Sequence, residues 1–267
     1  MSTSTVALVR RWAVDWLNGQ HPEVCEEVLA PDYALLIGGY LLGPRDTYVP
    51  ATLAQLSRYP GLVVTTHQLV VSGDRVAIVF TESGASARLD GRAAAWTGVS
   101  LFRGDGRQLT HCWAEEDYHG RRRQLDSGVC DPVAPPAPAP WDTRSEAPDP
   151  AAEEVVRQWL AGPDLRAADV VCDDEATGQA PERLLDVAGC AVHELFSAGG
   201  HVAFAATQSG TWLGGLDGLD DLVGRPAQLH LAGLVQVRDG RVAGGRVVRD
   251  RLGTARALRE AGGAVGG

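Results

Sequence analysis

Hydrophobic positions in the first half of the chain change from a helical period to a strand period. Apolar side chains recur every three or four positions in residues 6–17, ahead of a stop signal at Gly19. Shorter helices are predicted at residues 22–29 and 47–56. Strands with turn signals between them follow at residues 61–71, 75–84, 94–103 and 108–119. This order predicts an α+β fold, in which a curved antiparallel sheet wraps around N-terminal helices and leaves room for a pocket.

The second half of the chain repeats the pattern of the first. Matching segments occur in the same order: 9–12 with 156–159, 67–76 with 193–202, 81–84 with 207–210, and 98–107 with 233–241. In the second and third pairs the separation is constant at 126 positions. Ordered matches of this kind predict two tandem copies of one cone-shaped domain, and we expect the copies to pack as an intramolecular pseudo-dimer.

Proline and glycine mark the boundaries of the two copies. Residues 129–150 hold seven of the fifteen prolines and are predicted to form an extended linker. The first domain is therefore expected at residues 1–128 and the second at residues 151–260. The glycine-rich residues 261–267 are expected to form a flexible tail.

The second copy is shorter where a pocket wall is expected. Only 34 positions separate Trp159 from His193, whereas 55 separate Trp12 from His67. An additional stretch after Gly210 has the composition of a loop. We therefore interpret the second copy as degenerate and expect the working pocket in the first.

Composition excludes several classes of function. All 24 basic residues are arginine, so a lysine Schiff base, a pyridoxal phosphate anchor and a P-loop lysine are absent. The net charge of −10 disfavours nucleic acid and anionic membranes as partners. Five scattered cysteines favour free thiols over disulfides or a zinc site. Without a basic leader or an apolar run of about 18 residues, the protein is expected to be cytoplasmic and not bound to membranes.

The last predicted strand of the first copy carries the candidate chemistry. Strand alternation puts Leu109, His111, Trp113, Glu115 and Asp117 on one face. If that face lines the pocket, a histidine and carboxylates lie beside an apolar wall, where burial raises a carboxylate pKa toward neutrality. Structural roles stay open: Asp117 could pair with one of three following arginines, His111 could be a core histidine, and Glu115 could lie at a rim.

Several short motifs together resemble a known family. They are Leu29-Ala-Pro-Asp-Tyr33, Tyr59-Pro-Gly-Leu62, Ser72-Gly-Asp-Arg-Val76, Gly98-Val-Ser-Leu-Phe-Arg103, and Trp113 followed by Asp117 and Gln124-Leu125. In this order they resemble the SnoaL-like polyketide cyclases of the nuclear transport factor two-like superfamily, over residues 6–125. The resemblance implies a cone with a deep pocket and a reaction without metal or cofactor. It also implies that Asp117 acts as the acid/base group, and His111 is expected to assist it.

We expect the first domain to bind a small apolar substrate and to catalyse proton transfer next to a carbonyl. Cyclisation or isomerisation of a polyketide or terpenoid intermediate would follow. The predicted pocket residues are Trp16, Tyr33, Tyr40, Glu82, Trp96, Trp113 and Glu115. One alternative is a ligand-binding or partner-binding module without catalysis. Another is an epoxide hydrolase or dehydratase, for which the sequence shows no inward arginine with a second aspartate.

Overall fold

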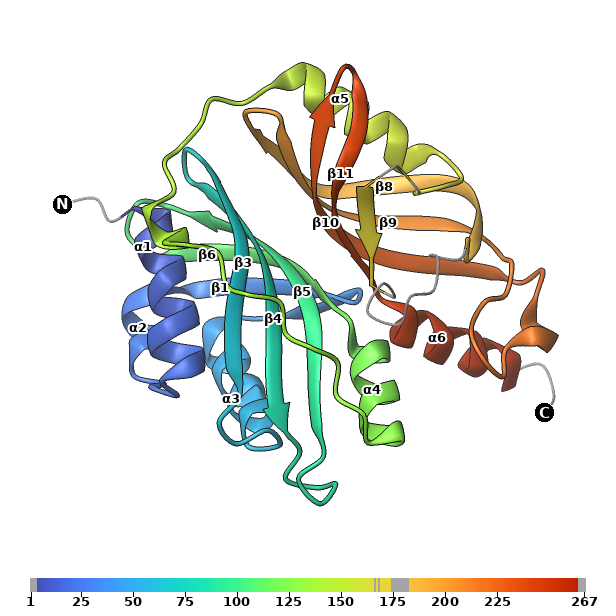
Figure 1. Cartoon of the computed structure of the whole chain (residues 1–267), viewed down its shortest axis with the longest axis horizontal. Helices are drawn as coiled ribbons and strands as arrows, with labels where there is room; N and C mark the ends of the chain where they lie inside the picture. Colours follow the sequence, from blue (N-terminus) through green and yellow to red (C-terminus); the bar gives the residue numbers. More distant parts are fainter. Residues whose placement is uncertain (1–3, 166, 168, 174–182, 264–267) are drawn as a thin grey trace.

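Two β-sheets packed against each other form the framework of the molecule (Figure 1). The computed structural model describes residues 4–165, 167, 169–173 and 183–263. Helices α1 to α3 lie on the side of the first sheet that faces away from the second sheet, and α5 covers the far side of the second sheet (Figure 1). Each half is therefore a sheet with helices on its outer side, as the sequence predicts. Among the described residues, no helix is long and apolar enough to cross a membrane.

The first sheet has six strands in the order β2-β1-β6-β5-β4-β3. Its strands are β1 (Leu29–Ile37), β2 (Tyr40–Leu42), β3 (Val63–Ser72), β4 (Arg75–Ala85), β5 (Ala93–Gly104) and β6 (Leu109–Glu116). Its helices are α1 (Thr5–Arg10), the π-helix η1 (Arg11–Asn18), α2 (Val24–Val28), α3 (Arg45–Leu56) and α4 (Tyr118–Ser127). The pattern of apolar residues did not predict β1 and β2, and β1 runs parallel to β6. The sheet is therefore mixed rather than wholly antiparallel.

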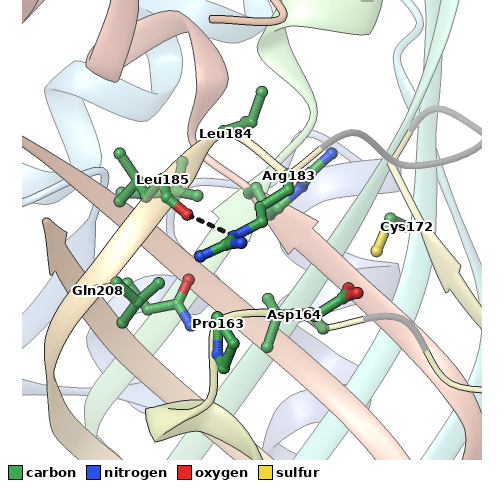
Figure 2. A pocket seen from close by; sticks show the side chains of 11 residues that line it. Pro163, Asp164, Cys172, Arg183, Leu184, Leu185 and Gln208 are labelled. Atoms are coloured by element: carbon green, nitrogen blue, oxygen red, sulfur yellow. Dashed lines mark hydrogen bonds between the residues drawn. The ribbon is translucent and has the colours of Figure 1, made fainter. Parts of the chain in front are cut away.

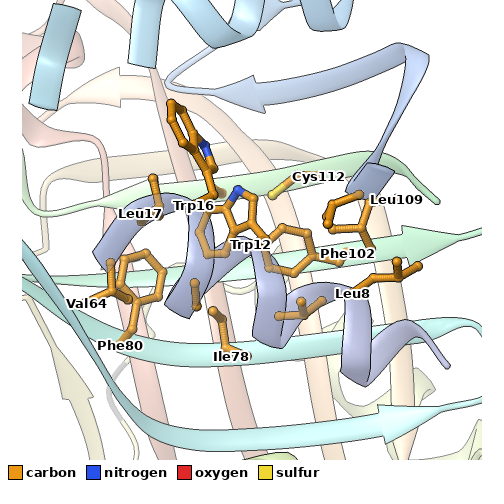
Figure 3. Packing of buried hydrophobic residues seen from close by; sticks show 14 of the residues in the cluster. Leu8, Trp12, Trp16, Leu17, Val64, Ile78, Phe80, Phe102, Leu109 and Cys112 are labelled. Atoms are coloured by element: carbon orange, nitrogen blue, oxygen red, sulfur yellow. The ribbon is translucent and has the colours of Figure 1, made fainter. Parts of the chain in front are cut away.

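Tryptophans from the first helices fill the concave side of this sheet. Trp12 and Trp16 are both buried, and the Trp12 ring meets Phe102 of β5 edge-on at 4.8 Å between centroids. Figure 3 shows these side chains stacked between the helix and the strands. Burying aromatic rings of this size on one face gives the amphipathic helix its main stabilisation.

The second sheet has five strands in the order β7-β11-β10-β9-β8. They are β7 (Asp169–Cys172), β8 (Leu185–Ala198), β9 (His201–Trp212), β10 (Pro226–Arg238) and β11 (Arg241–Arg249), with helices α5 (Pro150–Ala161), η4 (Asp220–Leu222) and α6 (Arg251–Gly263). The predicted tail therefore begins within α6, and residues 264–267 lie outside the described residues. The stretch expected to be a loop is partly buried, because Leu216, Leu219 and Leu222 pack against Trp212.

One packing device occurs in both copies. A Cβ atom added to Gly98 would lie 2.3 Å from the Phe80 ring, and one added to Gly233 would lie 2.3 Å from the Phe204 ring. Each phenylalanine therefore occupies the space above a strand glycine. This repeated pairing explains why both copies keep a glycine inside a strand, where it is otherwise unfavourable.

The faces of the two sheets that point away from their helices form an apolar interface. Val79, Val99 and Leu101 of the first domain pack with Phe196, Leu234 and others of the second in one buried cluster. At its edge, the buried Glu194 pairs with Arg103 at 2.6 Å and with Arg75 at 3.7 Å. This face of each sheet is thus covered by the other domain rather than by water.

The proline-rich linker follows the free edge of the first sheet. The amide of Ala137 donates to the Thr66 carbonyl, and the amide of Glu146 donates to the Val71 carbonyl, both at 2.9 Å. The 3-10 turn η2 (Pro140–Asp142) lies between these contacts. His67 bonds to the Pro135 carbonyl through Nδ1 at 3.0 Å and to the Thr81 hydroxyl through Nε2 at 2.8 Å. The linker therefore shields the edge strand β3.

Candidate functional site

A cavity of about 200 Å³ lies between the first sheet and its helices. From β1 it is lined by Tyr33, Leu35 and Ile37, and from β6 by Cys112, Ala114 and Glu116. Helices η1 and α3 contribute the opposite wall, which consists of Trp12, Leu17, Tyr48, Ala51, Thr52 and Gln55. The exposed Ala51 and the partly exposed Thr52 and Gln55 place the mouth of the cavity beside α3.

Two glutamates form a carboxyl pair in the wall of this cavity. Glu82 comes from β4 and Glu116 from β6, and the intervening strand β5 holds Trp96, which faces Glu82 in the strand register. Burial, together with the charge of Glu116, raises the pKa of Glu82 well above its ordinary value. Burial also raises the pKa of Glu116. The hydrogen bond between the two groups adds to the rise in pKa at Glu82 and opposes it at Glu116. With one proton shared between them, Glu82 would be the carboxylic acid and Glu116 the carboxylate.

Neighbouring donors orient the pair. The indole Nε1 of Trp96 donates to Glu116 Oε2 at 2.9 Å, and Gln55 Nε2 donates to Glu82 Oε2 at 3.4 Å. The Tyr118 hydroxyl is a further hydrogen-bond donor to Glu116. These bonds fix the positions of both carboxyl groups, as proton transfer requires.

A single arginine lies against the aromatic side chains beside the pair. The Arg121 guanidinium is 4.3 Å from the ring centroid of Tyr118, 4.9 Å from that of Trp96 and 5.4 Å from that of Tyr59. Its positive charge opposes the rise in pKa of both glutamates. Arg121 is therefore packed against three aromatic rings, from where its charge acts on both carboxyl groups.

The cavity wall also offers a buried phenol. Tyr33 is fully buried, and its hydroxyl donates a hydrogen bond to the Cys112 sulfur. Burial raises the pKa of Tyr33 well above its ordinary value and raises the pKa of the Cys112 thiol to about 12. Both groups are neutral near pH 7, so Tyr33 keeps its proton, and a ligand in the cavity would compete with Cys112 for the hydrogen bond that the phenol donates.

The raised pKa of Glu82 makes stability depend on pH. A carboxyl group whose pKa is higher in the folded state favours folding below its unfolded pKa, and this contribution is lost as pH rises through the folded pKa. Replacing Glu82 with Gln removes the penalty for ionising this group. We therefore expect urea unfolding curves of wild type and Glu82→Gln, measured from pH 5 to 9, to diverge in favour of the variant as pH rises. Curves that stay parallel over this range would show that Glu82 does not carry the shift.

Two of the predicted pocket residues line the cavity, and two lie behind it. Tyr33 and Glu82 are in the lining. Trp16 and Trp96 are buried in the adjacent core, where Trp96 reaches Glu116. Tyr40 is 61% exposed at the β1–β2 hairpin and does not line the cavity, which corrects its prediction as a pocket residue.

The other predicted residues lie on the opposite face of β6. Strand alternation does place four predicted residues on one face, namely His111, Trp113, Glu115 and Asp117. The cavity, however, is lined by the alternate residues Cys112, Ala114 and Glu116. His111 is exposed and stacks on Trp113 at 5.5 Å, and Trp113 packs into the interface between the sheets. Glu115 accepts a hydrogen bond from the Gly38 amide at 2.9 Å. The prediction that this face lines the pocket is wrong, because both faces of β6 are covered and alternation alone does not show which is the inner one.

Asp117 begins a helix instead of projecting into the cavity. Its Oδ1 accepts a hydrogen bond from the Gly120 amide at 2.8 Å and so caps α4. Asp250 accepts from the Gly253 amide at the same distance, at the start of α6. The ionic partner of Asp117 is Arg251 of the second domain at 2.7 Å, not one of Arg121 to Arg123. The shared aspartate in the two copies is therefore explained by helix capping.

The second domain does not repeat the carboxyl pair at the matching positions. A space of about 30 Å³ in this domain is lined in part by Arg183, whose Nε donates to the Leu185 carbonyl (Figure 2). The offset that relates His67 to His193 relates Glu82 to Gln208, and the offset that relates Asp117 to Asp250 relates Glu116 to Arg249. Comparing the copies position by position separates the capping aspartate, which is kept, from Glu82 and Glu116, which are not, but Glu115 also changes, to Val248, so the comparison alone would not have chosen between Glu115 and Glu116.

The cavity residues include no cluster suited to a metal ion. Among the described residues, no group of three or more histidine, cysteine, aspartate or glutamate side chains is arranged to hold one. The polar groups in or beside the cavity described above are the carboxyl pair, the phenol and the arginine.

Comparison with solved structures gives likenesses for one domain at a time. A candidate SnoaL-like polyketide cyclase from Jannaschia sp. CCS1 is 18% identical, with a TM-score of 0.44, over 47% of this chain and 94% of that chain. IdmH, a candidate polyketide cyclase from Streptomyces antibioticus, is 20% identical, with a TM-score of 0.41, over 46% and 99%. A Catenulispora acidiphila protein with a ketosteroid isomerase-like fold is 19% identical, with a TM-score of 0.41, over 45% and 92%.

The chain thus resembles the SnoaL-like polyketide cyclases in fold, as its sequence motifs predict. Each of these likenesses spans just under half of the chain. No protein-family model and no curated protein matches the sequence. The likenesses concern architecture, and the chemistry is argued below from the residues of this chain.

Proposed function

We propose that the first domain is an acid/base enzyme that moves a proton next to the carbonyl of a small apolar substrate. The observation that carries this proposal is the carboxyl pair in the wall of a largely apolar cavity, in which Glu82 is buried and the pKa of each group is raised, that of Glu82 well above its ordinary value. Pairs of titratable groups with different environments are typical of acid/base sites.

The proposed reaction uses three groups of the cavity. Glu116 takes a proton from the carbon next to the carbonyl, and the electron pair of that C–H bond moves onto the carbonyl oxygen. Tyr33 donates a hydrogen bond to the developing enolate oxygen. In an isomerisation, Glu116 returns the proton to a different carbon. In a cyclisation, the enolate carbon attacks a second carbonyl, and Glu82 protonates the new alkoxide. Neither route changes the oxidation state of the substrate as a whole.

A second candidate function adds water across an epoxide. It is favoured by Arg121, which lies over Trp96 and whose charge acts on the carboxyl pair, although it does not line the cavity itself. Glu116 would take a proton from water as the oxygen attacks an epoxide carbon, and Glu82 would protonate the opened epoxide oxygen. The site thus has the positive charge and the two carboxyl groups that this reaction requires. The carboxyl groups belong to glutamates rather than to aspartates.

One experiment separates these functions. The full chain is incubated with small cyclic ketones in D₂O and, separately, with small cyclic epoxides in ¹⁸O-labelled water. We expect enzyme-dependent loss of the α-proton signals of a ketone in ¹H NMR spectra. Labelled diol from an epoxide, without exchange into any ketone, would replace the first function by the second. Saturable quenching of tryptophan fluorescence by these compounds without either reaction would instead identify a binding module.

A further inference from the structure

Helix α4 contributes the charged and phenolic groups that surround the carboxyl pair. Tyr118, its first residue, lines the cavity and bonds to Glu116. Arg121 follows one turn later and lies over Trp96. The position of α4 therefore determines how close the positive charge and the phenol come to the two glutamates.

The start of α4 is held from the second domain. Asp117 Oδ1 accepts both the Gly120 amide at 2.8 Å and Arg251 Nη2 at 2.7 Å. Arg251 is the first residue of α6, and Figure 1 shows α4 and α6 meeting where the two domains join. The side chains of Asp117 and Arg251 are only 8% and 6% exposed, so water screens their attraction little.

Arg251 is itself fixed within the second domain. Its Nε lies 2.5 Å from Asp173 Oδ2, and Arg249 Nε lies 2.9 Å from Asp173 Oδ1. The Asp173 side chain is completely buried. Four charges of alternating sign therefore form a row, of which the second domain supplies three.

Two of these charges replace cavity residues of the first domain. At the offset that relates Asp117 to Asp250, Glu116 corresponds to Arg249 and Tyr118 corresponds to Arg251. The second copy thus has arginines at the two positions that in the first copy provide the carboxylate and its phenol donor. The same substitutions therefore also supply both arginines of the row of charges that reaches α4.

We propose that Arg251 is a positioning residue for the cavity of the other domain: it fixes the start of α4, and thereby holds Arg121 and Tyr118 beside Glu82 and Glu116. The second domain then acts as a built-in support for the chemistry of the first. For its catalytic consequence the inference rests on the proposed function, but the positioning itself is measurable without any substrate.

The test is a titration of the two glutamates in the full chain. The protein is labelled with ¹³C at the glutamate carboxyl carbons, and the Glu82→Gln and Glu116→Gln variants assign the signals. Besides each other, the pair faces Gln55 from α3, Trp96 from β5, and Tyr118 and Arg121 from α4. Arg251→Met is expected to move the titration midpoints to higher pH, because Arg121 then lies farther from the two glutamates and stabilises their ionised carboxylates less.

Two further variants separate positioning from general damage. Asp117→Asn keeps a good capping side chain for α4 but removes the charge that Arg251 binds, so it is expected to move the midpoints in the same direction. Arg103→Met breaks another ion pair between the domains, that with Glu194, and is the matched control. Its midpoints are expected to stay at the wild-type values.

Unchanged midpoints in both Arg251→Met and Asp117→Asn, or an equal movement in Arg103→Met, would overturn the inference. The titration remains decisive if Arg251→Met does not fold, because Asp117→Asn then carries the measurement. If the midpoints move but neither ketone exchange nor epoxide opening is found, the positioning role stands and the proposed function fails.

Discussion

Glu116→Gln is expected to lower α-proton exchange into a ketone substrate by at least about a hundredfold, because it removes the carboxylate that accepts the proton. Glutamine has nearly the same shape and can still accept the hydrogen bond from Trp96 Nε1. The cavity should therefore keep its form and its affinity for the ketone. The measurement is the rate of signal loss in D₂O at saturating ketone, together with the dissociation constant from tryptophan fluorescence.

Glu115→Gln provides the matched control for this experiment. Glu115 is the preceding residue, is also buried, and lies on the opposite face of β6 against the Gly38 amide. Burial raises the pKa of Glu115 well above its ordinary value, so a neutral glutamine resembles its preferred state. Exchange is expected at the wild-type rate. If Glu116→Gln keeps full activity, or if both variants lose it equally, Glu116 is not the base.

Asp173→Ala is expected to lower the free energy of unfolding by about 3–5 kcal/mol, because it removes the carboxylate shared by two buried arginines. Arg249 and Arg251 are 5% and 6% exposed at their side chains, and both contact Asp173 within 3 Å. Water cannot readily replace the lost partner at such positions. The change is measured by urea unfolding followed by circular dichroism.

Asp186→Ala is the control for the loss of an ion pair as such. Asp186 also pairs with an arginine, Arg183, at 2.5 Å, but its side chain is 66% exposed. An exposed pair of this kind contributes about 0–1 kcal/mol, so little change in the unfolding curve is expected. An equal decrease in the free energy of unfolding in Asp173→Ala and Asp186→Ala would mean that burial does not determine how much these ion pairs contribute to stability.

The architecture was largely predictable from the sequence. Residues 67–76 and 193–202 both form hairpin strands, and the four-strand meander appears at β3 to β6 as predicted. Local periodicity and turn residues carry this information, because they depend on neighbours along the chain. Strands β1 and β2 were missed because β1 pairs in parallel with β6, a partner more than seventy residues away.

The candidate site was only partly predictable. Glu82 and Tyr33 were identified, whereas Glu116 was passed over in favour of Glu115 and Asp117 on the other face. The alternation of β6 correctly separates its residues into two sets. Choosing between the sets requires knowing that the second domain covers one face with Phe196 and Leu234, and no local pattern shows this.

The sequence by itself determined that the protein contains one α+β module twice, that the second copy is shorter where the first has its helical layer, and that no lysine takes part in its chemistry. Only the tertiary structure decided which face of β6 borders the cavity, that Glu82 and Glu116 form the carboxyl pair, and that Asp117 binds Arg251. The reason is physical. Hydrophobic periodicity records whether a side chain is buried, but proton affinity and ion pairing depend on which distant groups share that buried space.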